Sequence, residues 1–393
     1  MRIVIDGTTL CAPDGSRGAG IEHYSWSITT ELLRSASSHE FFVATPPSLS
    51  RIRREELEQM GPHVTLLPSF GPKLSFLSRH VLLPLRFFLR RPDVLFSPFG
   101  QIPLGWFGKS VVTVHDMAIY DHPEWFPEHQ NFATRVIVPK SLERATQVIA
   151  VSCATEQKLH ALIPSTIGKT QVIYEGVDLQ EAYDALKDAD DSNVRFPFDR
   201  DFVLFLGTIE PRKNLLNAFR AFHAFLKSRP EQATQVRFIV AGKKGWHTKE
   251  IEQELIEINH AWKEVEPNGV IQFLGPVTEE EKWHLIARAS CLLYPSLDEG
   301  FGLPLLEAMA VGTPVIASNR GALPEVGGDA AVYVDPEDIE AMSFALIQCL
   351  LVPEGVREIR ELGLERATEF SWTRTAKETL KVLKNVGQTK NEA

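Results

Sequence analysis

Short apolar runs of strand length recur along the chain, and stretches with helical spacing of their apolar positions separate them. This alternation predicts a parallel sheet whose strands are joined by crossover helices. The first series of runs reads R-I-V-I-D (2–6), F-F-V-A-T (41–45), V-T-L-L-P (64–68), V-L-F-S (94–97), V-V-T-V-H (111–115), Q-V-I-A-V-S (147–152) and Q-V-I-Y (171–174).

A second series of apolar runs follows a stretch that has no such pattern. Residues 184–201 are acidic and then proline-bearing, which is typical of a linker. The later runs read F-V-L-F-L-G (202–207), V-R-F-I-V-A-G (236–242), V-I-Q-F-L-G (270–275), C-L-L-Y-P-S (291–296), P-V-I-A-S (314–318) and A-V-Y-V (331–334).

Two series of this kind predict an α/β protein with two Rossmann-like domains that face each other across a cleft. We place the N-terminal domain at 1–195 and the C-terminal domain at 196–370. The tail, 371–393, is helical by pattern up to about Val386.

Composition narrows the class of protein. The chain has 393 residues, 44% apolar and 23% charged, as in ordinary globular proteins, and its net charge of −10 argues against nucleic-acid binding. The cysteines form no C-x-x-C pair, which favours free thiols and no structural zinc; they are Cys11, Cys153, Cys291 and Cys349. The chain opens directly on a predicted strand, and no run reaches the roughly 18 apolar residues of a membrane-spanning helix. We therefore expect a soluble, cytoplasmic protein.

The segment 73–91 mixes leucines and phenylalanines with arginines. One interpretation is peripheral contact with the inner face of a membrane, with apolar side chains down and arginines at the headgroups. The other is a core helix, kinked at Pro84, whose arginines face water. The second interpretation is favoured.

The segment 298–318 carries the strongest functional pattern. Glu299 and Glu307 lie eight positions apart across a glycine-bearing turn that follows a predicted strand. Pro304 stands where a helix should begin, and Gly312 is its expected C-cap. We expect Glu299 in the turn and Glu307 in the first helical turn, both at the carboxyl end of a parallel sheet, where such sheets bind ligands.

Two carboxylates in this position suit a polyol, because each can accept hydrogen bonds from vicinal hydroxyls. The alternative is that Glu307 only complements the helix dipole and Glu299 is a solvated loop acid. The complete strand–turn–helix pattern resembles the E-x7-E signature of retaining, nucleotide-sugar-dependent glycosyltransferases of family four. The resemblance covers essentially the whole chain, most specifically 206–214 and 296–325, and implies the GT-B architecture with a C-terminal helix that crosses back to the first domain.

The turn L-G-T-I-E-P-R-K-N (206–214) ends the first strand of the second domain and opens a helix. Arg212 and Lys213 are adjacent cations there, and a helix N-terminus also favours anions. The turn matches the family's phosphate clamp, so Gly207, Arg212 and Lys213 are predicted to bind a diphosphate. In contrast, Asp188-Ala189-Asp190 matches the D-x-D of metal-dependent sugar transferases but lies in the acidic linker, and we predict no metal site.

Four further positions are predicted from loops at strand ends. The loop 14–24 is similar to the family's G-G-I/V loop, with Ala19 in place of one glycine, which leaves Gly20 as the residue expected to approach the ligand. His115 ends a strand and can contact a sugar hydroxyl, although a lone histidine is more often structural. Lys243 is expected to line the donor pocket, and the resemblance places the base near Leu274.

The resemblance implies transfer of a sugar from a nucleotide diphosphate donor with retention at the anomeric carbon, without a metal or other cofactor. Glu307 would bind the ribose, and Glu299 with the backbone of Phe301, Gly302 and Leu303 would hold the sugar. Arg212 and Lys213 would stabilise the diphosphate as it leaves, and His115 would contact the donor sugar.

The donor and acceptor are expectations from the same resemblance, which is strongest to bacterial mannosyltransferases of surface-polysaccharide assembly. We expect GDP-mannose ahead of UDP-glucose or another UDP-sugar, and a glycan or lipid-linked glycan as acceptor. A nucleotide-sugar epimerase or hydrolase on the same fold would need a dedicated acid/base cluster. A non-catalytic binding relative would be favoured by loss of Glu299, Glu307 or Lys213, and all three are present.

Overall fold

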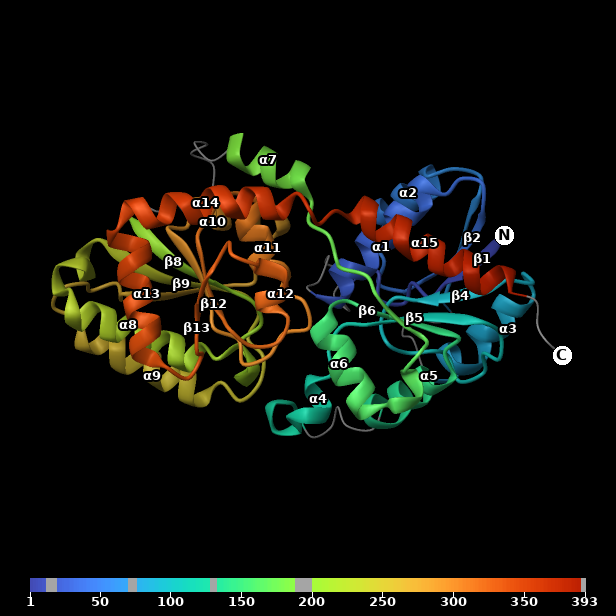
Figure 1. Cartoon of the computed structure of the whole chain (residues 1–393), viewed down its shortest axis with the longest axis horizontal. Coiled ribbons are helices and arrows are strands. Elements are labelled where there is room, and N and C mark those ends of the chain that lie inside the picture. The colour runs from blue at the N-terminus through green and yellow to red at the C-terminus, as the bar shows by residue number, and fades with distance from the viewer. Residues whose placement is uncertain (12–19, 70–75, 128–132, 188–199, 390–393) are drawn as a thin grey trace. The chain divides into compact units, whose positions relative to one another are not determined.

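In the computed structural model, the described residues are 1–11, 20–69, 76–127, 133–187 and 200–389 (Figure 1). The chain divides into two compact units. Unit 1 consists of Met1–Asp121, Pro127–Gly176 and Ser371–Ala393, and unit 2 of His122–Phe126 and Val177–Phe370. Each is a parallel α/β unit, which confirms the predicted fold class.

Unit 1 contains a seven-stranded parallel sheet in the order β3-β2-β1-β4-β5-β6-β7. All seven predicted runs form strands within one or two residues of their expected ends. The strands are β1 (Arg2–Ile5), β2 (Glu40–Thr45), β3 (Val64–Pro68), β4 (Val94–Ser97), β5 (Ser110–Val114), β6 (Gln147–Ala150) and β7 (Thr170–Val172).

The helices of unit 1 connect these strands. They are α1 (Ile21–Ser35), α2 (Arg51–Gln59), the π-helix η1 (Ser78–Leu82), α3 (Leu83–Phe88), α4 (Ala118–Asp121), η4 (Ala133–Ile137), α5 (Val138–Arg144), α6 (Cys153–Leu162), η5 (Pro164–Thr166) and α15 (Trp372–Gln388).

The C-terminal helix α15 packs against α1 in unit 1, as the red and blue ribbons in Figure 1 show. The rings of Tyr24 and Trp372 lie 5.8 Å apart at 65°, and the Thr375 hydroxyl donates a 2.8 Å hydrogen bond to the carbonyl of Tyr174. A Cβ at Gly176 would lie 2.3 Å from the Trp372 nitrogen. Only a glycine therefore permits this close approach of the returning chain.

Unit 2 contains a six-stranded parallel sheet in the order β10-β9-β8-β11-β12-β13. Its six predicted runs also form strands. They are β8 (Asp201–Leu206), β9 (Val236–Ala241), β10 (Ile271–Gly275), β11 (Cys291–Tyr294), β12 (Val315–Ser318) and β13 (Val332–Val334).

The helices of unit 2 are more numerous than its strands. They are η2 (Pro123–Trp125), α7 (Leu179–Lys187), η7 (Pro211–Lys213), α8 (Leu215–Ser228), η8 (Pro230–Thr234), α9 (Lys249–Ala261), α10 (Glu279–Arg288), α11 (Leu303–Ala310), α12 (Leu323–Gly327), α13 (Ile339–Leu351) and α14 (Pro353–Ala367).

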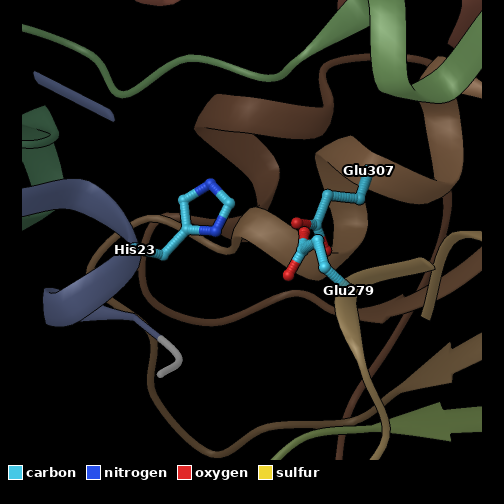
Figure 2. Close-up of side chains that lie close together, drawn as sticks. All are labelled: His23, Glu279 and Glu307. Carbon is cyan, nitrogen blue, oxygen red and sulfur yellow. The ribbon is translucent and has the colours of Figure 1, made fainter. Parts of the chain in front are cut away.

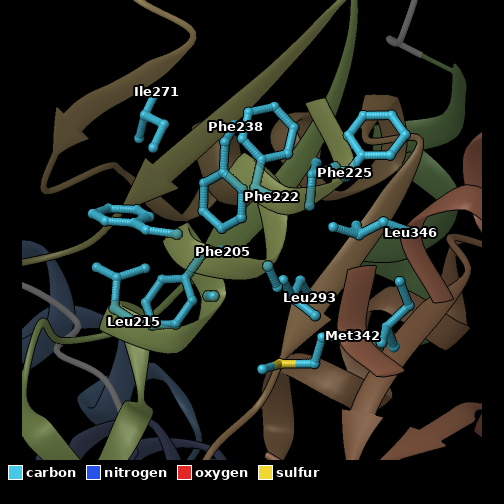
Figure 3. Close-up of a cluster of buried hydrophobic side chains, with 14 of the residues drawn as sticks. Phe205, Leu215, Phe222, Phe225, Phe238, Ile271, Leu293, Met342 and Leu346 are labelled. Atoms are coloured by element: carbon cyan, nitrogen blue, oxygen red, sulfur yellow. The ribbon is translucent and has the colours of Figure 1, made fainter. Parts of the chain in front are cut away.

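The core of unit 2 lies between the sheet and helices α8, α9 and α13 (Figure 3). On α8, the buried positions follow helical spacing, which brings three phenylalanines onto one face. The ring of Phe222 lies 5.3 Å from that of Phe238 on β9, and Phe219 lies 5.5 Å from the same ring, in edge-on geometry. Aromatic pairs of this type add stability beyond their buried area.

The structure places the boundary between the units differently from our expectation of 195/196. Unit 2 begins its long segment at Val177, and residues 184–187 of the predicted linker belong to helix α7. This helix buries Ala182 and Ala185 and contacts α10, and Glu181 accepts a 2.8 Å hydrogen bond from the Trp283 indole. The acidic composition concealed an amphipathic helix with a partner far along the chain. The D-x-D at 188–190 lies outside the described residues.

Three smaller expectations can also be compared with the structure. All four cysteines are free thiols. Among the described residues, no single helix is long and apolar enough to cross a membrane; α13 and α14 pass that test only as a pair, bent by 92°. The segment 76–88 is one continuous helical run that includes η1 and α3, and Pro84 lies inside it. Proline has no N–H to donate to the His80 carbonyl four residues earlier, and that carbonyl accepts from the Gly105 nitrogen at 2.9 Å instead.

Candidate functional site

The strand order of unit 2 reverses between β8 and β11, and the loops that follow these two strands diverge there. Open parallel sheets bind ligands at the carboxyl ends of strands beside such a switch point. The loop after β8 carries Arg212 and Lys213, and the loop after β11 carries Glu299. The structure therefore brings together three predicted site residues that lie up to 87 positions apart.

The turn that carries the two cations is held from its C-terminal side by Asn214. This residue has a left-handed backbone (φ 56°), and its side-chain amide donates to the carbonyls of Pro295 at 3.1 Å and Pro336 at 2.6 Å. The Leu297 nitrogen donates to the Arg212 carbonyl at 2.8 Å. These bonds connect the loops after β8, β11 and β13, so the positions of the cations are fixed by three strands.

Glu299 is buried and accepts hydrogen bonds from both cations. Arg212 Nη1 lies 2.8 Å from Glu299 Oε2, and Lys213 Nζ lies 2.5 Å from Oε1. The Tyr294 hydroxyl also donates to Oε1 at 2.8 Å. Arg212 makes a second ion pair of 3.0 Å with Glu210. We call Arg212, Lys213 and Glu299 the carboxyl-end cluster.

The protonation states in this cluster follow from burial and neighbouring charge. Burial opposes ionisation of Glu299, but Arg212 and Lys213 outweigh it and lower the pKa of Glu299 to about 2. Burial lowers the pKa of Lys213, Arg212 lowers it further, and Glu299 opposes both. The cluster is thus an ionised, water-poor site whose carboxylate and ammonium depend on each other for their charge.

Backbone packing holds Glu299 at the switch point. The Ala322 nitrogen donates to the Glu299 carbonyl at 2.9 Å. Gly321 has φ +61°, and a Cβ there would lie 2.6 Å from the Glu299 oxygen and 2.7 Å from its nitrogen. Gly302, at φ 105°, stands immediately before α11. Gly321 therefore lets its turn approach the Glu299 backbone closely, and a Cβ at Gly302 would lie 2.6 Å from the Leu323 side chain.

Glu307 lies on α11 beside Glu279, which begins α10, as Figure 2 shows. The Lys282 ammonium lies 2.5 Å from Glu307 and also pairs with Glu279. Burial opposes the charge of Lys282, but the two carboxylates raise the pKa of Lys282 above its usual value. Glu307 is the fifth residue of α11, so the expectation that it lies in the first turn was wrong: the helix begins at Leu303, and Pro304 is its second residue.

A cavity of about 300 Å³ opens at the carboxyl ends of β8, β9 and β10. Its walls are mainly apolar, and Lys244 and Glu252 add charged groups that form a 2.5 Å ion pair. The lining residues are Ile209, Gly242, Lys244, Thr248, Ile251, Glu252, Phe273, Gly275 and Pro276. The predicted Lys243 and Leu274 are the immediate neighbours of Lys244 and Gly275. Gly207 follows strand β8 and has φ 148°.

His115 follows β5 at the carboxyl edge of unit 1. Its Nδ1 lies 2.9 Å from the Glu175 carboxylate and its Nε2 lies 2.8 Å from the Pro98 carbonyl. Burial lowers the pKa of His115, but Glu175 and the Pro98 carbonyl outweigh it, so the pKa is raised. Two acceptors on one ring favour the doubly protonated imidazolium. Contact with a sugar hydroxyl would require His115 to exchange one of these bonds.

Gly20 stands immediately before α1 with φ 59°, and a Cβ there would meet no atom within 4 Å. Its backbone conformation explains the glycine. Most of the loop to which it belongs, 12–19, lies outside the described residues.

Sequence reasoning missed five polar residues of the sites around Glu299 and Glu307: Glu210, Asn214, Glu279, Lys282 and Tyr294. Lys282 had a usable signal, because T-E-E-E (278–281) forms a capping box that fixes where α10 begins. Tyr294 had none, since a tyrosine that ends an apolar strand is ordinarily a core residue.

The two units and the carboxyl-end cluster define an α/β enzyme of the two-Rossmann type, and comparison with known proteins gives its family. Residues 18–181 match the family model "Glycosyltransferase Family 4", and residues 187–366 match "Glycosyl transferases group 1". The chain belongs to this glycosyltransferase family and is a glycosyltransferase.

Individual relatives give the same result. The chain is 31% identical to the O-antigen chain mannosyltransferase B of Escherichia coli over 285 residues, and this aligned region covers 70% of each protein. It is 25% identical over 353 residues to the O-antigen chain mannosyltransferase RfbU of Salmonella typhimurium, covering 87% of this chain and 90% of the relative. The solved sucrose-phosphate synthase of Thermosynechococcus elongatus covers 98% of both chains at 21% identity and a TM-score of 0.73, which shows the shared GT-B fold.

Proposed function

We propose that this protein transfers mannose from GDP-mannose to a glycan or lipid-linked glycan acceptor, with retention of the anomeric configuration. The observation that carries the proposal is the carboxyl-end cluster. Arg212, Lys213 and Glu299 converge at the switch point of the second sheet, next to an apolar cavity. A nucleotide sugar needs a cationic site for its diphosphate, a polyol site for its sugar and an apolar site for its base.

The diphosphate is assigned to Arg212 and Lys213. Lys213 is buried and the Arg212 side chain is 13% exposed, and Glu210 and Glu299 balance their charge. A diphosphate would add acceptors in a site of low dielectric, where each charge-assisted hydrogen bond is strong. As the leaving group gains charge, these fixed donors would stabilise it without reorganisation.

The two glutamates are assigned to the hydroxyls of the donor. Glu299, held by Gly321 and Ala322, would accept hydrogen bonds from the transferred sugar, aided by the backbone at Phe301, Gly302 and Leu303. Glu307 would accept from the ribose. Lys282 would hold the Glu307 carboxylate in position when the donor is present, through their buried ion pair.

The chemical step follows from this arrangement. The bond between the anomeric carbon and the β-phosphate oxygen breaks, and the acceptor oxygen forms a bond to the same face of that carbon. The acceptor proton passes to the departing phosphate, so atoms and charge balance. Arg212 and Lys213 would supply the charge stabilisation that other transferases obtain from a divalent metal ion, and the proposed reaction requires none. His115 is assigned a positioning role, since both ring nitrogens are engaged within unit 1.

The base is assigned to the cavity at the ends of β8, β9 and β10. The Watson–Crick edge of guanine presents two N–H donors beside one carbonyl acceptor. A carboxylate can accept both donors and an ammonium can donate to the carbonyl, and the cavity wall carries one of each, Glu252 and Lys244. This complementarity supports guanine over uracil. The names of the bacterial relatives support mannose as the sugar and a polysaccharide precursor as the acceptor.

Substitution of Glu299 tests the site. Glu299→Gln keeps the shape of the side chain but removes the charge that the cluster needs, and we expect kcat to fall by at least about a hundredfold. The control is Glu337→Gln, which neutralises an exposed carboxylate that is also paired with an arginine. The measurement is radiolabelled mannose transfer, with folding checked by circular dichroism. Unchanged turnover in Glu299→Gln would remove the cluster from the mechanism.

A ligand panel tests the donor. Thermal denaturation is followed with GDP-mannose, GDP, UDP-glucose and UDP, with and without a chelator. A ligand at about a hundred times its Kd adds about 2.7 kcal/mol to the free energy of unfolding. Stabilisation by guanine nucleotides in both conditions is the expected result. Stabilisation by uridine nucleotides alone would contradict the donor assignment, dependence on metal would contradict the metal-free reaction, and no stabilisation would favour a non-catalytic role.

A further inference from the structure

The segment formed by η1 and α3 exposes an apolar face. Leu77, Val81, Leu85, Phe88 and Leu89 are all exposed, with Leu89 at 81%. Leu77, Val81 and Leu85 follow one another at intervals of four residues, and Phe88 and Leu89 come three and four residues later, which is the spacing of side chains on one side of a helix. Scattered exposed apolar residues are common, but a continuous stripe indicates a contact surface.

The opposite face of the same segment is already used. His80, Leu83 and Phe87 are buried, and Leu83 and Phe87 belong to the core of unit 1. The exposed stripe is therefore additional to the face that the fold requires. The interpretation favoured from the sequence was a core helix whose arginines face water, and it did not include this exposed apolar stripe.

A neighbouring loop extends the stripe. Residues 104–107 lie against η1, because the Gly105 nitrogen donates to the His80 carbonyl at 2.9 Å and the Trp106 ring stacks on Phe88 at 4.8 Å. This contact leaves the next side chain, Phe107, 83% exposed beside the helix. We call the stripe together with Phe107 the apolar ledge.

The charge around the apolar ledge has one sign. Residues 76–91 contain Arg79, Arg86, Arg90 and Arg91 and no acidic residue, in a chain whose net charge is −10. Arg90 and Arg91 are exposed, and the guanidinium of Arg144 lies 5.6 Å from the centroid of the Phe107 ring. An apolar surface bordered by arginines matches the hydrocarbon boundary and phosphate headgroups of an anionic lipid layer.

We propose that the apolar ledge docks unit 1 onto the surface of an anionic lipid bilayer. Leu89, Phe107 and Leu85 enter the boundary between headgroups and acyl chains, while Arg86, Arg90 and Arg91 contact lipid phosphates. A second copy of the chain is a poorer occupant. A two-fold interface apposes identical surfaces, and like-charged arginines would then meet each other. The proposal does not depend on the identity of the sugar donor.

The test is co-sedimentation of the full chain with vesicles of phosphatidylcholine alone or of phosphatidylcholine mixed with phosphatidylglycerol, which gives the vesicle surface a negative potential. The variant is Leu89→Glu/Phe107→Glu, which places two carboxylates on the ledge without touching the core. The control is Ile52→Glu, on α2, where an equally exposed apolar residue (78%) is replaced. We expect binding to the anionic vesicles only, a loss of partitioning of at least about tenfold in the double variant, and no loss in Ile52→Glu.

Several outcomes would overturn the proposal. The first is that the wild type does not partition into anionic vesicles, and the second is that the double variant and Ile52→Glu lose binding equally. The third is that binding is unaffected by salt at several hundred millimolar, where the attraction to headgroups is screened (Debye length about 3–8 Å). A dimer in analytical ultracentrifugation that only the double variant dissociates would instead assign the apolar ledge to a second copy. Stabilisation by nucleotides is measured in a separate experiment, so a negative result with vesicles would not contradict the proposed transfer reaction.

Discussion

Unit 2 contains two clusters, at opposite ends of one sheet, in which two cations share a buried glutamate, and their chemistry is nearly the same. At the carboxyl ends, Arg212 and Lys213 pair with Glu299. At the amino ends, Arg237, in β9, and Arg200, just before β8, both pair with Glu266, just before β10. Each cluster has one carboxylate shared by two cations, and each carboxylate is buried. We call the second set the amino-end cluster.

The two clusters differ in what else surrounds the charges. The Arg237 guanidinium also donates to the carbonyls of Ala233 and Val236, both at 3.0 Å, and so closes the η8–β9 corner. The carboxyl-end cluster lies among loops, at the switch point and near a cavity, and its carboxylate also receives the Tyr294 hydroxyl. Buried ion pairs by themselves therefore do not identify a functional site; their position relative to the strand direction does.

The largest effect is expected at the amino-end cluster. Glu266→Gln would leave two cations near a neutral amide, and breaking a buried pair of this kind costs about 3–5 kcal/mol of the free energy of unfolding. Urea denaturation measures that loss, and transfer assays at low temperature measure kcat of the folded variant. We expect a large loss of stability with kcat within about twofold of wild type, since this cluster touches no proposed ligand. If kcat fell together with the stability, the amino-end cluster would also contribute to the reaction, and the distinction between the two clusters would be wrong.

Lowering the pH should reduce the free energy of unfolding through Glu299, which belongs to the carboxyl-end cluster. The pKa of Glu299 is lowered to about 2 in the folded protein, against about 4.3 when unfolded. Its stabilising contribution is therefore complete above about pH 4.3 and is lost as the pH falls toward 2, amounting to about 3 kcal/mol over that range. Urea denaturation from pH 5.5 to 3.0 should show a steeper loss in the wild type than in Glu299→Gln. Parallel curves would mean that the two cations do not stabilise the ionised carboxylate.

The smallest effect tests backbone support of Glu299. A Cβ at Gly321 would collide with the Glu299 backbone, so Gly321→Ala should shift that loop, cost about 1–3 kcal/mol and lower kcat. Gly328→Ala is the matched control, because it also has a positive φ (+54°) but its Cβ would meet Arg366 only at 3.5 Å. Both variants should lose stability in thermal denaturation, and only Gly321→Ala should lose activity. Equal kcat in the two variants would show that the position of Glu299 tolerates movement.

Much of the fold could be predicted because strands in a parallel sheet are buried on both faces and appear as continuous apolar runs. All thirteen predicted runs became strands, and the carboxylates at 299 and 307 were found because glycine, proline and glutamate mark a strand–turn–helix by local rules. The same local rules failed at 184–187, where acidic composition suggested a linker and the partner that buries Ala182 and Ala185 lies about a hundred residues away.

The sequence by itself determined the α/β class, the repeated series of strands and the residue types at each strand end, because those depend on periodicity and backbone preference within a few positions. Tertiary structure alone decided which charges meet. Arg212 and Glu299, Lys282 and Glu307, and His115 and Glu175 are joined by strand order and helix packing. The physical reason is that an ion pair needs its two groups within about 4 Å, and no local pattern encodes a distance between residues far apart in the chain.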